Sequence, residues 1–254
     1  MPKLIFITNS LESGGAERVM SILANEFVKL GYDISIVSKV HKSPFYELDP
    51  KIKLIYPPNQ IHYKNKIKTL ISRLSIYFDI FKIIKSAKPD IVIPFSTTTN
   101  GSIIPICKVL GIKVIACEHN NYKLNIEKIP IWIIKRIIYK WADKLTVLTH
   151  RDIDFFYGRF MKNVVVMPNP LPLKPLNQST NFEREKLILA VGNVSRWKHK
   201  GFDNMINIYS NIFKKHPEWE LQIAGGGDAD YLYRLINKYE LNGHIKLNRS
   251  SCDL

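Results

Sequence analysis

Short apolar runs alternate with longer helical stretches along this chain, and that alternation limits its fold more than any other feature. Residues 4–7, 33–37 and 113–117 are predicted to be buried β-strands, and residues 16–30 and 64–85 are predicted to be helices. Near-continuous apolar strands that alternate with helices are typical of a parallel sheet covered on both faces. The sequence therefore predicts an α/β protein. Further strands are expected at residues 52–56, 90–93, 145–148, 164–167, 187–191, 221–224 and 244–247, and further helices at 103–110, 131–142, 151–160, 202–215 and 230–239.

A proline-rich segment interrupts this alternation. Pro168, Pro170, Pro172 and Pro175 follow one another closely, and proline is excluded from helix interiors and central strands. We therefore expect a Rossmann-like N-terminal domain at residues 1–168, a linker at 169–186 and a second Rossmann-like domain at 187–254. The second domain is expected to be partial, because its predicted strands are about half of those in a typical doubly wound domain.

The composition narrows the range of partners. Hydrophobic residues make up 46% of the chain, so it can bury a core, and its formal net charge of +15 favours an anionic partner. That partner could be a phosphorylated ligand, a membrane surface or a nucleic acid. The three cysteines are scattered, which argues against a disulfide framework or a structural zinc site. We see no signal peptide or membrane span in the sequence and expect a cytoplasmic protein.

Gly14 and Gly15 lie between the first predicted strand and the first predicted helix. Glycines there allow a phosphate to approach the backbone, and the N-terminus of the helix offers free N–H groups. The alternative is a tight turn without a ligand. The segment is neither a dinucleotide fingerprint nor a P-loop, and the second strand ends in Ser38-Lys39 instead of the acidic residue that binds a ribose.

Three further segments follow the ends of predicted strands. Residues 191–203 contain Arg196, Lys198 and Lys200, which could bind a phosphate or form a solvated basic loop. His119 could contact a sugar or titrate near neutrality, although a lone histidine is more often structural. Residues 224–228 include three consecutive glycines and could form a ligand loop or a flexible turn.

Taken in order, these segments resemble glycosyltransferase family 4, whose members are retaining enzymes with the GT-B fold and nucleotide-sugar donors. The resemblance extends over almost the whole chain, and no single motif would be sufficient for it. The matching segments are Gly14-Gly15-Ala16-Glu17, Met167-Pro168-Asn169-Pro170, Val191-Gly192, Lys200-Gly201-Phe202-Asp203 and Ile223-Ala224-Gly225-Gly226-Gly227. The implied fold is GT-B-like, with an acceptor-side first domain and a partial nucleotide-sugar-binding second domain.

The resemblance also implies roles for individual residues. Gly14 and Gly15 would face the donor diphosphate, Arg196 with Lys200 would neutralise it, and His119 would contact the donor sugar as the catalytic candidate. The donor would be a UDP- or GDP-sugar, and the resemblance implies neither a cofactor nor a metal.

The chain departs from the family pattern in two places. Asn193 stands where the family has an arginine, and Arg196 follows three residues later. The Glu-x7-Glu motif of the family does not occur in the 254 residues. The sequence therefore resembles a family member truncated before that motif, and we expect weak or no transfer from this chain alone.

Two basic segments suggest the acceptor. Residues 61–88 and 128–144 combine lysines and arginines with aliphatic and aromatic residues, a pattern that suits an anionic membrane surface. The acceptor would then be a saccharide or lipid-linked saccharide of a bacterial surface polysaccharide, such as a capsule or lipopolysaccharide. The protein would lie peripherally on the inner face of the cell membrane. The alternative is that the apolar stripes are core and the basic stripes are solvated.

Other classes of protein fit less well. A nucleotide-dependent oxidoreductase would share the alternation but needs the dinucleotide fingerprint. A nucleic-acid-binding protein would explain the charge, but no recognisable nucleic-acid-binding motif occurs, so we expect no nucleic-acid partner. A non-catalytic remnant or an acceptor-binding protein is the main alternative.

Overall fold

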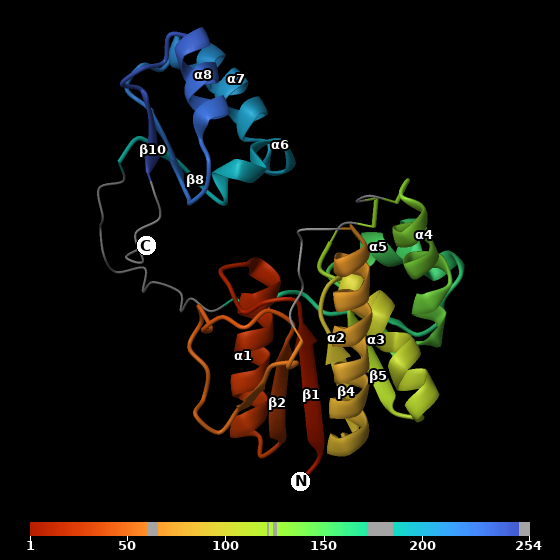
Figure 1. The fold of residues 1–254 in the computed structure, drawn as a ribbon. Helices are drawn as coiled ribbons and strands as arrows, with labels where there is room; N and C mark the ends of the chain where they lie inside the picture. The colour runs from red at the N-terminus through yellow and green to blue at the C-terminus, as the bar shows by residue number, and fades with distance from the viewer. Residues whose placement is uncertain (60–65, 121, 124–125, 172–184, 249–254) are drawn as a thin grey trace. The chain divides into compact units, whose positions relative to one another are not determined.

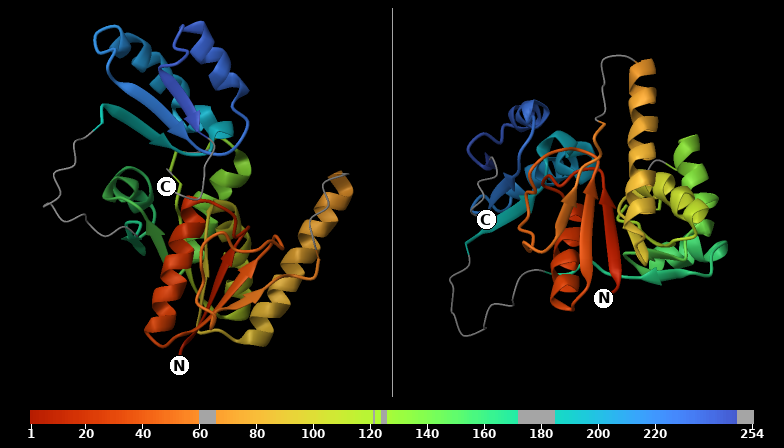
Figure 2. Two further views of the ribbon diagram at one scale, coloured as in Figure 1. Left: turned by 90° about the vertical axis from the view of Figure 1, so that its left-hand side faces the viewer. Right: turned by 60° about the horizontal axis from the view of Figure 1, so that its bottom comes forward.

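The computed structural model describes residues 1–59, 66–120, 122–123, 126–171 and 185–248. The chain divides into two compact units, Met1–Lys174 and Pro175–Leu254, and each is an α/β body of its own (Figures 1 and 2). The division falls within residues 169–186, where the sequence predicts a linker. Residues 172–184 of that segment lie outside the described residues, so the linker stays a prediction.

A parallel seven-stranded sheet forms the centre of the first unit, in the order β3-β2-β1-β4-β5-β6-β7. The order reverses between β1 and β4, and ligands of open α/β sheets bind outside the carboxyl ends of the strands at such a point. The strands are β1 (Lys3–Thr8), β2 (Asp33–Ser38), β3 (Lys53–Ile55), β4 (Ile91–Pro94), β5 (Lys113–Cys117), β6 (Lys144–Val147) and β7 (Val164–Val166).

Helices cover both faces of this sheet (Figures 1 and 2). Side chains alternate along β1, so that Leu4 and Phe6 pack with α1 (Gly15–Lys29) while Ile5 and Ile7 face the opposite cluster. That cluster includes residues of α2 (Lys66–Ala87), α3 (Thr97–Leu110), α4 (Ile129–Arg136), η1 (Ile138–Trp141), α5 (His150–Phe155) and η2 (Tyr157–Arg159). The near-continuous apolar strands of the sequence are thus explained by burial on both sides.

Three helices of the first unit differ from the sequence prediction, and one of them, expected at residues 151–160, is divided into α5 and η2. The helix expected at residues 103–110 begins earlier, at Thr97. The sequence pattern does not reveal its first turn, because the residues there are polar although they are buried. The helix expected at residues 131–142 is divided into α4 and η1. Lys135, expected on a basic surface, is completely buried and donates a hydrogen bond to the carbonyl of Tyr122 at 3.0 Å.

The second unit contains a three-stranded parallel sheet in the order β10-β9-β8. Its strands are β8 (Leu187–Val191), β9 (Glu220–Ala224) and β10 (Ile245–Asn248), and its longer helices are α7 (Phe202–Phe213) and α8 (Asp230–Lys238). Ile206 of α7, Leu232 of α8 and Ile223 of β9 meet in one buried cluster. The loop expected after β8 is instead helical, with η3 (Val194–Arg196) followed by α6 (Trp197–Lys200).

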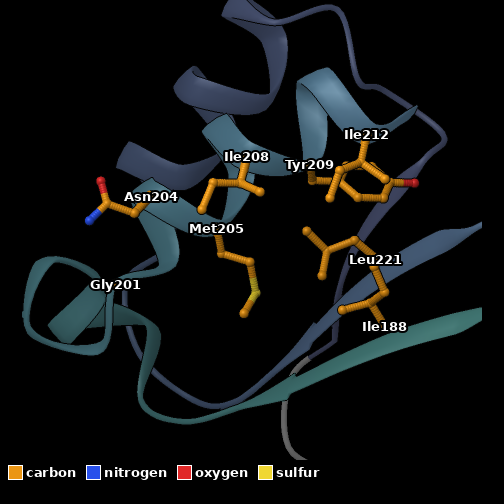
Figure 3. A pocket seen from close by; sticks show the side chains of 8 residues that line it. All are labelled: Ile188, Gly201, Asn204, Met205, Ile208, Tyr209, Ile212 and Leu221. Carbon is orange, nitrogen blue, oxygen red and sulfur yellow. The ribbon is translucent and has the colours of Figure 1, made fainter. Parts of the chain in front are cut away.

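An apolar groove of about 350 Å³ lies between α7 and the strands β8 and β9 (Figure 3). Met205 and Ile208 line it from the helix, and Ile188 and Leu221 line it from the strands. Also on β8, the side chains of Leu189 and Val191 are 49% and 66% exposed. Because side chains alternate along a strand, these two lie on the face of β8 opposite to Ile188 and the groove.

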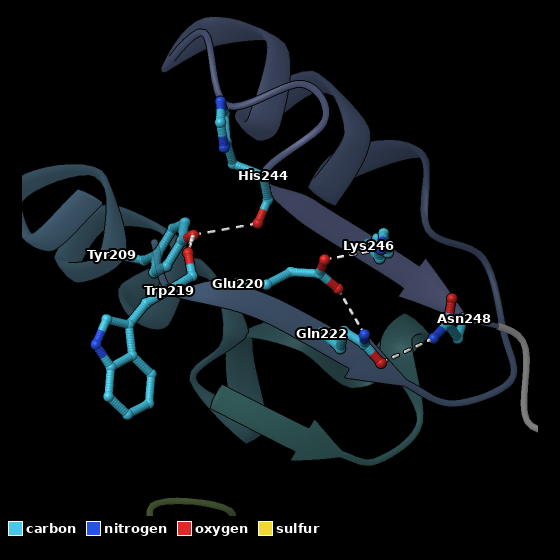
Figure 4. A network of polar contacts seen from close by, with 7 residues as sticks. All are labelled: Tyr209, Trp219, Glu220, Gln222, His244, Lys246 and Asn248. Carbon is cyan, nitrogen blue, oxygen red and sulfur yellow. Dashed lines mark hydrogen bonds and ion pairs between the residues drawn. The ribbon is translucent and has the colours of Figure 1, made fainter. Parts of the chain in front are cut away.

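A polar network ties the strands of the second unit to α7 (Figure 4). The buried Tyr209 hydroxyl lies 2.6 Å from the carbonyl oxygen of Trp219 and 3.2 Å from that of His244. Across β9 and β10, Lys246 forms an ion pair with Glu220 at 2.7 Å. Tyr209 therefore links one helix to the segments that lead into two strands.

Replacing Tyr209 by phenylalanine should destabilise the second unit. The change leaves the ring in place but removes the hydroxyl, so we expect the free energy of unfolding to fall by about 1–2 kcal/mol. Urea titration followed by circular dichroism measures the loss. Tyr233→Phe is the control, because Tyr233 is 52% exposed. An equal effect of both substitutions would contradict the assigned role.

Candidate functional site

The carboxyl edge of the first sheet brings together most of the residues singled out in the first unit. Gly14 and Gly15 follow β1, Lys39 follows β2 and His119 follows β5. Because the strands are parallel, the segments after them all leave the sheet at the same edge. The segments that contain Gly14, Lys39 and His119 therefore share one edge of the first sheet.

His119 lies flat against an aromatic ring near the end of β4. Its imidazole stacks on Phe95, with 5.1 Å between ring centroids and an interplanar angle of 8°. Burial lowers the pKa of His119, while the charge of Glu118 and the side chain of Asn169 oppose that shift. Neither ring nitrogen has a hydrogen-bond partner of good geometry among the described residues. The neutral imidazole keeps one donor and one acceptor, but both ring nitrogens are buried in this structure.

Glu118, which sequence reasoning missed, anchors the same corner. Its buried carboxylate accepts hydrogen bonds from the hydroxyls of Thr97 and Tyr139, both at 2.6 Å, and from the backbone N–H of Asn120 at 2.9 Å. The backbone on both sides of His119 is thereby fixed to α3 and η1. The only sequence signal was an acidic residue directly after an apolar strand.

Asn169 belongs to the Met167-Pro168-Asn169-Pro170 segment on which the resemblance partly rests. Its side chain lies close enough to the His119 imidazole to raise the pKa of that histidine. The backbone N–H of Met167 donates to the carbonyl of Val147 at 2.8 Å and so ties the segment to β6. The fold thus brings together two motifs that are far apart in the sequence.

Gly14, the first glycine after β1, lies under a carboxylate of the chain itself, whereas a Cβ atom on Gly15 would meet nothing within 4 Å. Gly14 is the N-cap of α1, and a Cβ atom at this position would overlap the side-chain carboxylate of Glu17. Burial is the main cause that raises the pKa of Glu17, and the charge of Glu12 adds to the rise. The helix N-terminus, where the resemblance implies a diphosphate, is therefore occupied by an internal anion.

In the second unit, two loops are joined by close backbone contacts. A Cβ atom on Gly225 would collide with the carbonyl of Gly192, and Gly227 has a φ of 117° beside Ser195. The backbone N–H of Asp228 donates to the hydroxyl of Ser195 at 2.6 Å. The glycines after β9 are therefore required by packing against the loop after β8.

Both cations of the predicted phosphate site belong to the segment after β8, and both are exposed. Arg196 ends η3, and Lys200 ends α6. The stem of Lys200 lies over Gly192, where a Cβ atom would be 3.4 Å from its Cε. The side chain of Asn193 accepts from the N–H of Ser195 at 3.0 Å and so starts η3. Asn193, the residue that departs from the family pattern, thus starts the turn that places Arg196 three residues further along the chain.

Carboxylates of the chain serve structural roles where the sequence contains Asp-x-Asp. Asp152, the first of one such pair, forms a capping box with Thr149 at the start of α5. Asp228, the first of the other, accepts from the N–H of Asp230 at 2.9 Å. In the segments that the structure describes, no group of three or more metal-ligating side chains could hold an ion. That no metal takes part stays a prediction.

Comparison with known families covers both units. Residues 13–174 match the family described as Glycosyltransferase Family 4, and residues 174–251 match the one described as Glycosyl transferases group 1. The chain belongs to glycosyltransferase family 4. The resemblance seen in the sequence is thus confirmed, whereas the roles of Gly14, Gly15, His119, Arg196 and Lys200 stay predictions.

Two curated relatives extend beyond the part that this family 4 chain matches. An uncharacterised glycosyltransferase of Haemophilus influenzae is 30% identical over 230 residues, which are 89% of this chain and 62% of that protein. A Campylobacter jejuni protein is 32% identical over 232 residues, with the same shares of 89% and 62%. It is named GalNAc-alpha-(1->4)-GalNAc-alpha-(1->3)-diNAcBac-PP-undecaprenol alpha-1,4-N-acetyl-D-galactosaminyltransferase. The chain spans 62% of the length of these two relatives.

Solved structures agree with the family 4 assignment at the level of the fold. Sucrose-phosphate synthase from Thermosynechococcus elongatus has a TM-score of 0.79 at 12% identity, and the match covers 99% of this chain and 71% of that one. Anabaena HepE, solved with UDP and glucose, has a TM-score of 0.70 at 13% identity and coverage of 100% and 70%. The predicted α/β fold of the GT-B type is confirmed.

Replacing Glu118 by glutamine should lower the pKa of His119. The substitution removes the negative charge that raises this pKa and leaves the burial that lowers it. His119 should then titrate at a lower pH than in the wild type, as measured by NMR of the imidazole carbons. Asp79→Asn, which alters another buried carboxyl group on α2, should leave the titration unchanged. An unchanged pKa in Glu118→Gln would refute the coupling.

Proposed function

We propose that the protein transfers a sugar from a UDP- or GDP-sugar to a saccharide or lipid-linked saccharide acceptor in surface polysaccharide synthesis. The observation that carries this proposal is the family 4 match over residues 13–174, continued by the group 1 match over residues 174–251. The Campylobacter relative is named for an acceptor on PP-undecaprenol, and HepE was solved with UDP and glucose. The first name supports a lipid-linked acceptor, and the second supports a nucleotide donor.

The chemistry requires stabilisation of the leaving nucleoside diphosphate. Negative charge develops on the diphosphate as the glycosidic bond breaks, and cations and N–H donors positioned in advance lower that barrier. In this proposal Arg196 and Lys200 supply the cations. Gly14 and Gly15 let the diphosphate approach the N-terminus of α1 closely. The carboxylate of Glu17 must then move away from that N-terminus.

His119 is proposed to contact the donor sugar through a ring nitrogen. A neutral imidazole can hydrogen-bond a sugar hydroxyl without bringing a charge into the site. Retention of the anomeric configuration is part of the proposal by family membership, and we assign no protein nucleophile to it.

Nucleotide binding tests the role of the basic segment. Charge-assisted hydrogen bonds contribute about 1.5–3 kcal/mol, so Arg196→Ala or Lys200→Ala should weaken UDP binding by about tenfold or more. Isothermal titration calorimetry measures the dissociation constant. Lys198→Ala is the matched control, because Lys198 is an exposed lysine of the same short helix. Equal losses in all three variants would refute the specific roles and leave only a general effect of charge.

We also propose that the α4–η1 surface contacts the anionic inner face of the cell membrane. The exposed fractions of Ile129, Trp132 and Trp141 are 74%, 46% and 46%, and the side chains of Lys128 and Lys140 are exposed beside them. Aromatic and basic residues on one surface suit the headgroup region of a bilayer. In the part of the chain that the structure describes, no helix is both long enough and apolar enough to cross a membrane.

Vesicle binding tests this surface. The wild type should sediment with vesicles that contain phosphatidylglycerol and much less with purely zwitterionic vesicles. Trp132→Ala combined with Trp141→Ala should reduce the bound fraction at least severalfold. Leu30→Ala is the control, because Leu30 is also exposed, at 72%, but lies at the end of α1. Undiminished sedimentation of the double variant would assign membrane binding to another surface.

A further inference from the structure

Lys39 is a charged residue in the core of the first unit. It directly follows β2, and only 4% of its surface is exposed. Its backbone N–H donates to the carbonyl of Thr8 at 3.2 Å, which continues the pairing of β2 with β1. The side chain therefore enters the sheet edge on the side of Val37, where α2 and α3 pack.

The ammonium group of Lys39 is poorly compensated. Its Nζ donates to the hydroxyl of Thr99 at 3.3 Å and lies 5.2 Å from the ring centroid of Tyr77. Within the described residues no carboxylate forms an ion pair with it. Burial lowers the pKa of Lys39 to about 8, so the group is still mostly protonated at neutral pH.

Other buried ionised groups of this unit have stronger partners. Glu118 accepts three hydrogen bonds, and Asp79 accepts from the side chain of Asn59 at 2.7 Å and from its backbone at 3.2 Å. Asp152 is part of a capping box. Burial lowers the pKa of Lys135, and the charges of Glu118 and Asp152 oppose that shift. A buried charge without such compensation costs several kcal/mol. The charge of Lys39 is therefore less well compensated than the charges of these groups.

The N-terminus of α3 lies beside the Lys39 ammonium, and Thr97 of the same turn donates to the carboxylate of Glu118. Thr99 lies in the first turn of α3, a 14-residue helix without an acidic residue in that turn. The first N–H groups of a helix have no partner within the helix and carry a partial positive charge. α3 follows β4, so the site lies at the β1/β4 reversal of strand order, and Thr98 of the same turn is exposed there.

We propose that Lys39 and the first turn of α3 form a binding site for the phosphoryl group of a ligand. The ammonium and the helix N–H groups would supply the donors, and the phosphate oxygens would supply the missing negative charge. The residues of this site all belong to the first unit, whereas Arg196 and Lys200 belong to the second unit. The inference concerns binding in the first unit and stands even if no sugar is transferred.

Thermal unfolding with inorganic phosphate tests the proposal. The parent protein for this test carries Arg196→Ala and Lys200→Ala, so that the basic segment of the second unit does not respond. At constant ionic strength, its Tm should rise by about 3 °C or more once phosphate exceeds its Kd about tenfold. Adding Lys39→Met should abolish this rise. In buffer without phosphate, the Met variant should melt at or above the Tm of the parent, because an uncompensated buried charge is gone.

Lys42→Met in the same parent is the matched control. Lys42 is an exposed lysine that pairs with Glu12, so its loss should leave the phosphate response intact. A phosphate response that persists in the Lys39→Met variant would overturn the proposal, as would a parent that shows none. A Lys39→Met variant that melts well below the parent without phosphate would also overturn it, since Lys39 would then be structural.

Two probes distinguish the source of the phosphoryl group. Phenyl phosphate represents a phosphorylated ligand, and inorganic phosphate represents the free ion. A response to both probes that is lost in Lys39→Met supports a site for the phosphoryl group of a larger ligand. A response to inorganic phosphate alone, also lost in Lys39→Met, supports a site for the free ion and overturns the assignment to a ligand.

Discussion

The parallel pairing of β1 with both β2 and β4 is the constraint on which the first unit depends. Because these strands are all parallel, the segments after β1, β2, β4 and β5 leave the sheet at one edge, and the strand order reverses at β1 and β4. Glu118 then fixes that edge internally, since its carboxylate holds α3 through Thr97 and η1 through Tyr139. The position of His119 on Phe95 follows from these contacts. The site is thus held by regular structure and not by its loops alone.

The sequence predicts the fold well because burial on both faces leaves a plain apolar pattern in parallel strands. Every strand and helix expected from that pattern within the described residues is present, although α3 begins earlier than expected and the helices expected at 131–142 and 151–160 are each divided in two. The exceptions involve polar residues whose partners are distant. Thr97 and Tyr139 each lie 21 residues from Glu118, so no local pattern could reveal that the first turn of α3 is helical and buried.

The candidate site likewise has residues that the sequence indicates and residues that it does not. Glycines and cations that follow strands can be found from their spacing, as Gly14, Gly15, Arg196 and Lys200 were. The burial of a lysine cannot, because it depends on what packs over it. Lys39 and Lys135 read as ordinary surface cations in the sequence, yet their exposed fractions are 4% and 0%. The charge surplus of the chain therefore includes cations that face inward, and not only a solvated basic surface.

Glu17 gives the loop after β1 a property that its glycines alone would not have. The carboxylate over Gly14 is attached to the same helix, so its effective concentration at the helix N-terminus is high at all times. A singly charged ion from solution competes poorly with such a tethered group, whereas an extended, multiply charged ligand can compensate for its removal. We therefore expect the loop to favour polyanions that gain contacts elsewhere over chloride and simple carboxylates.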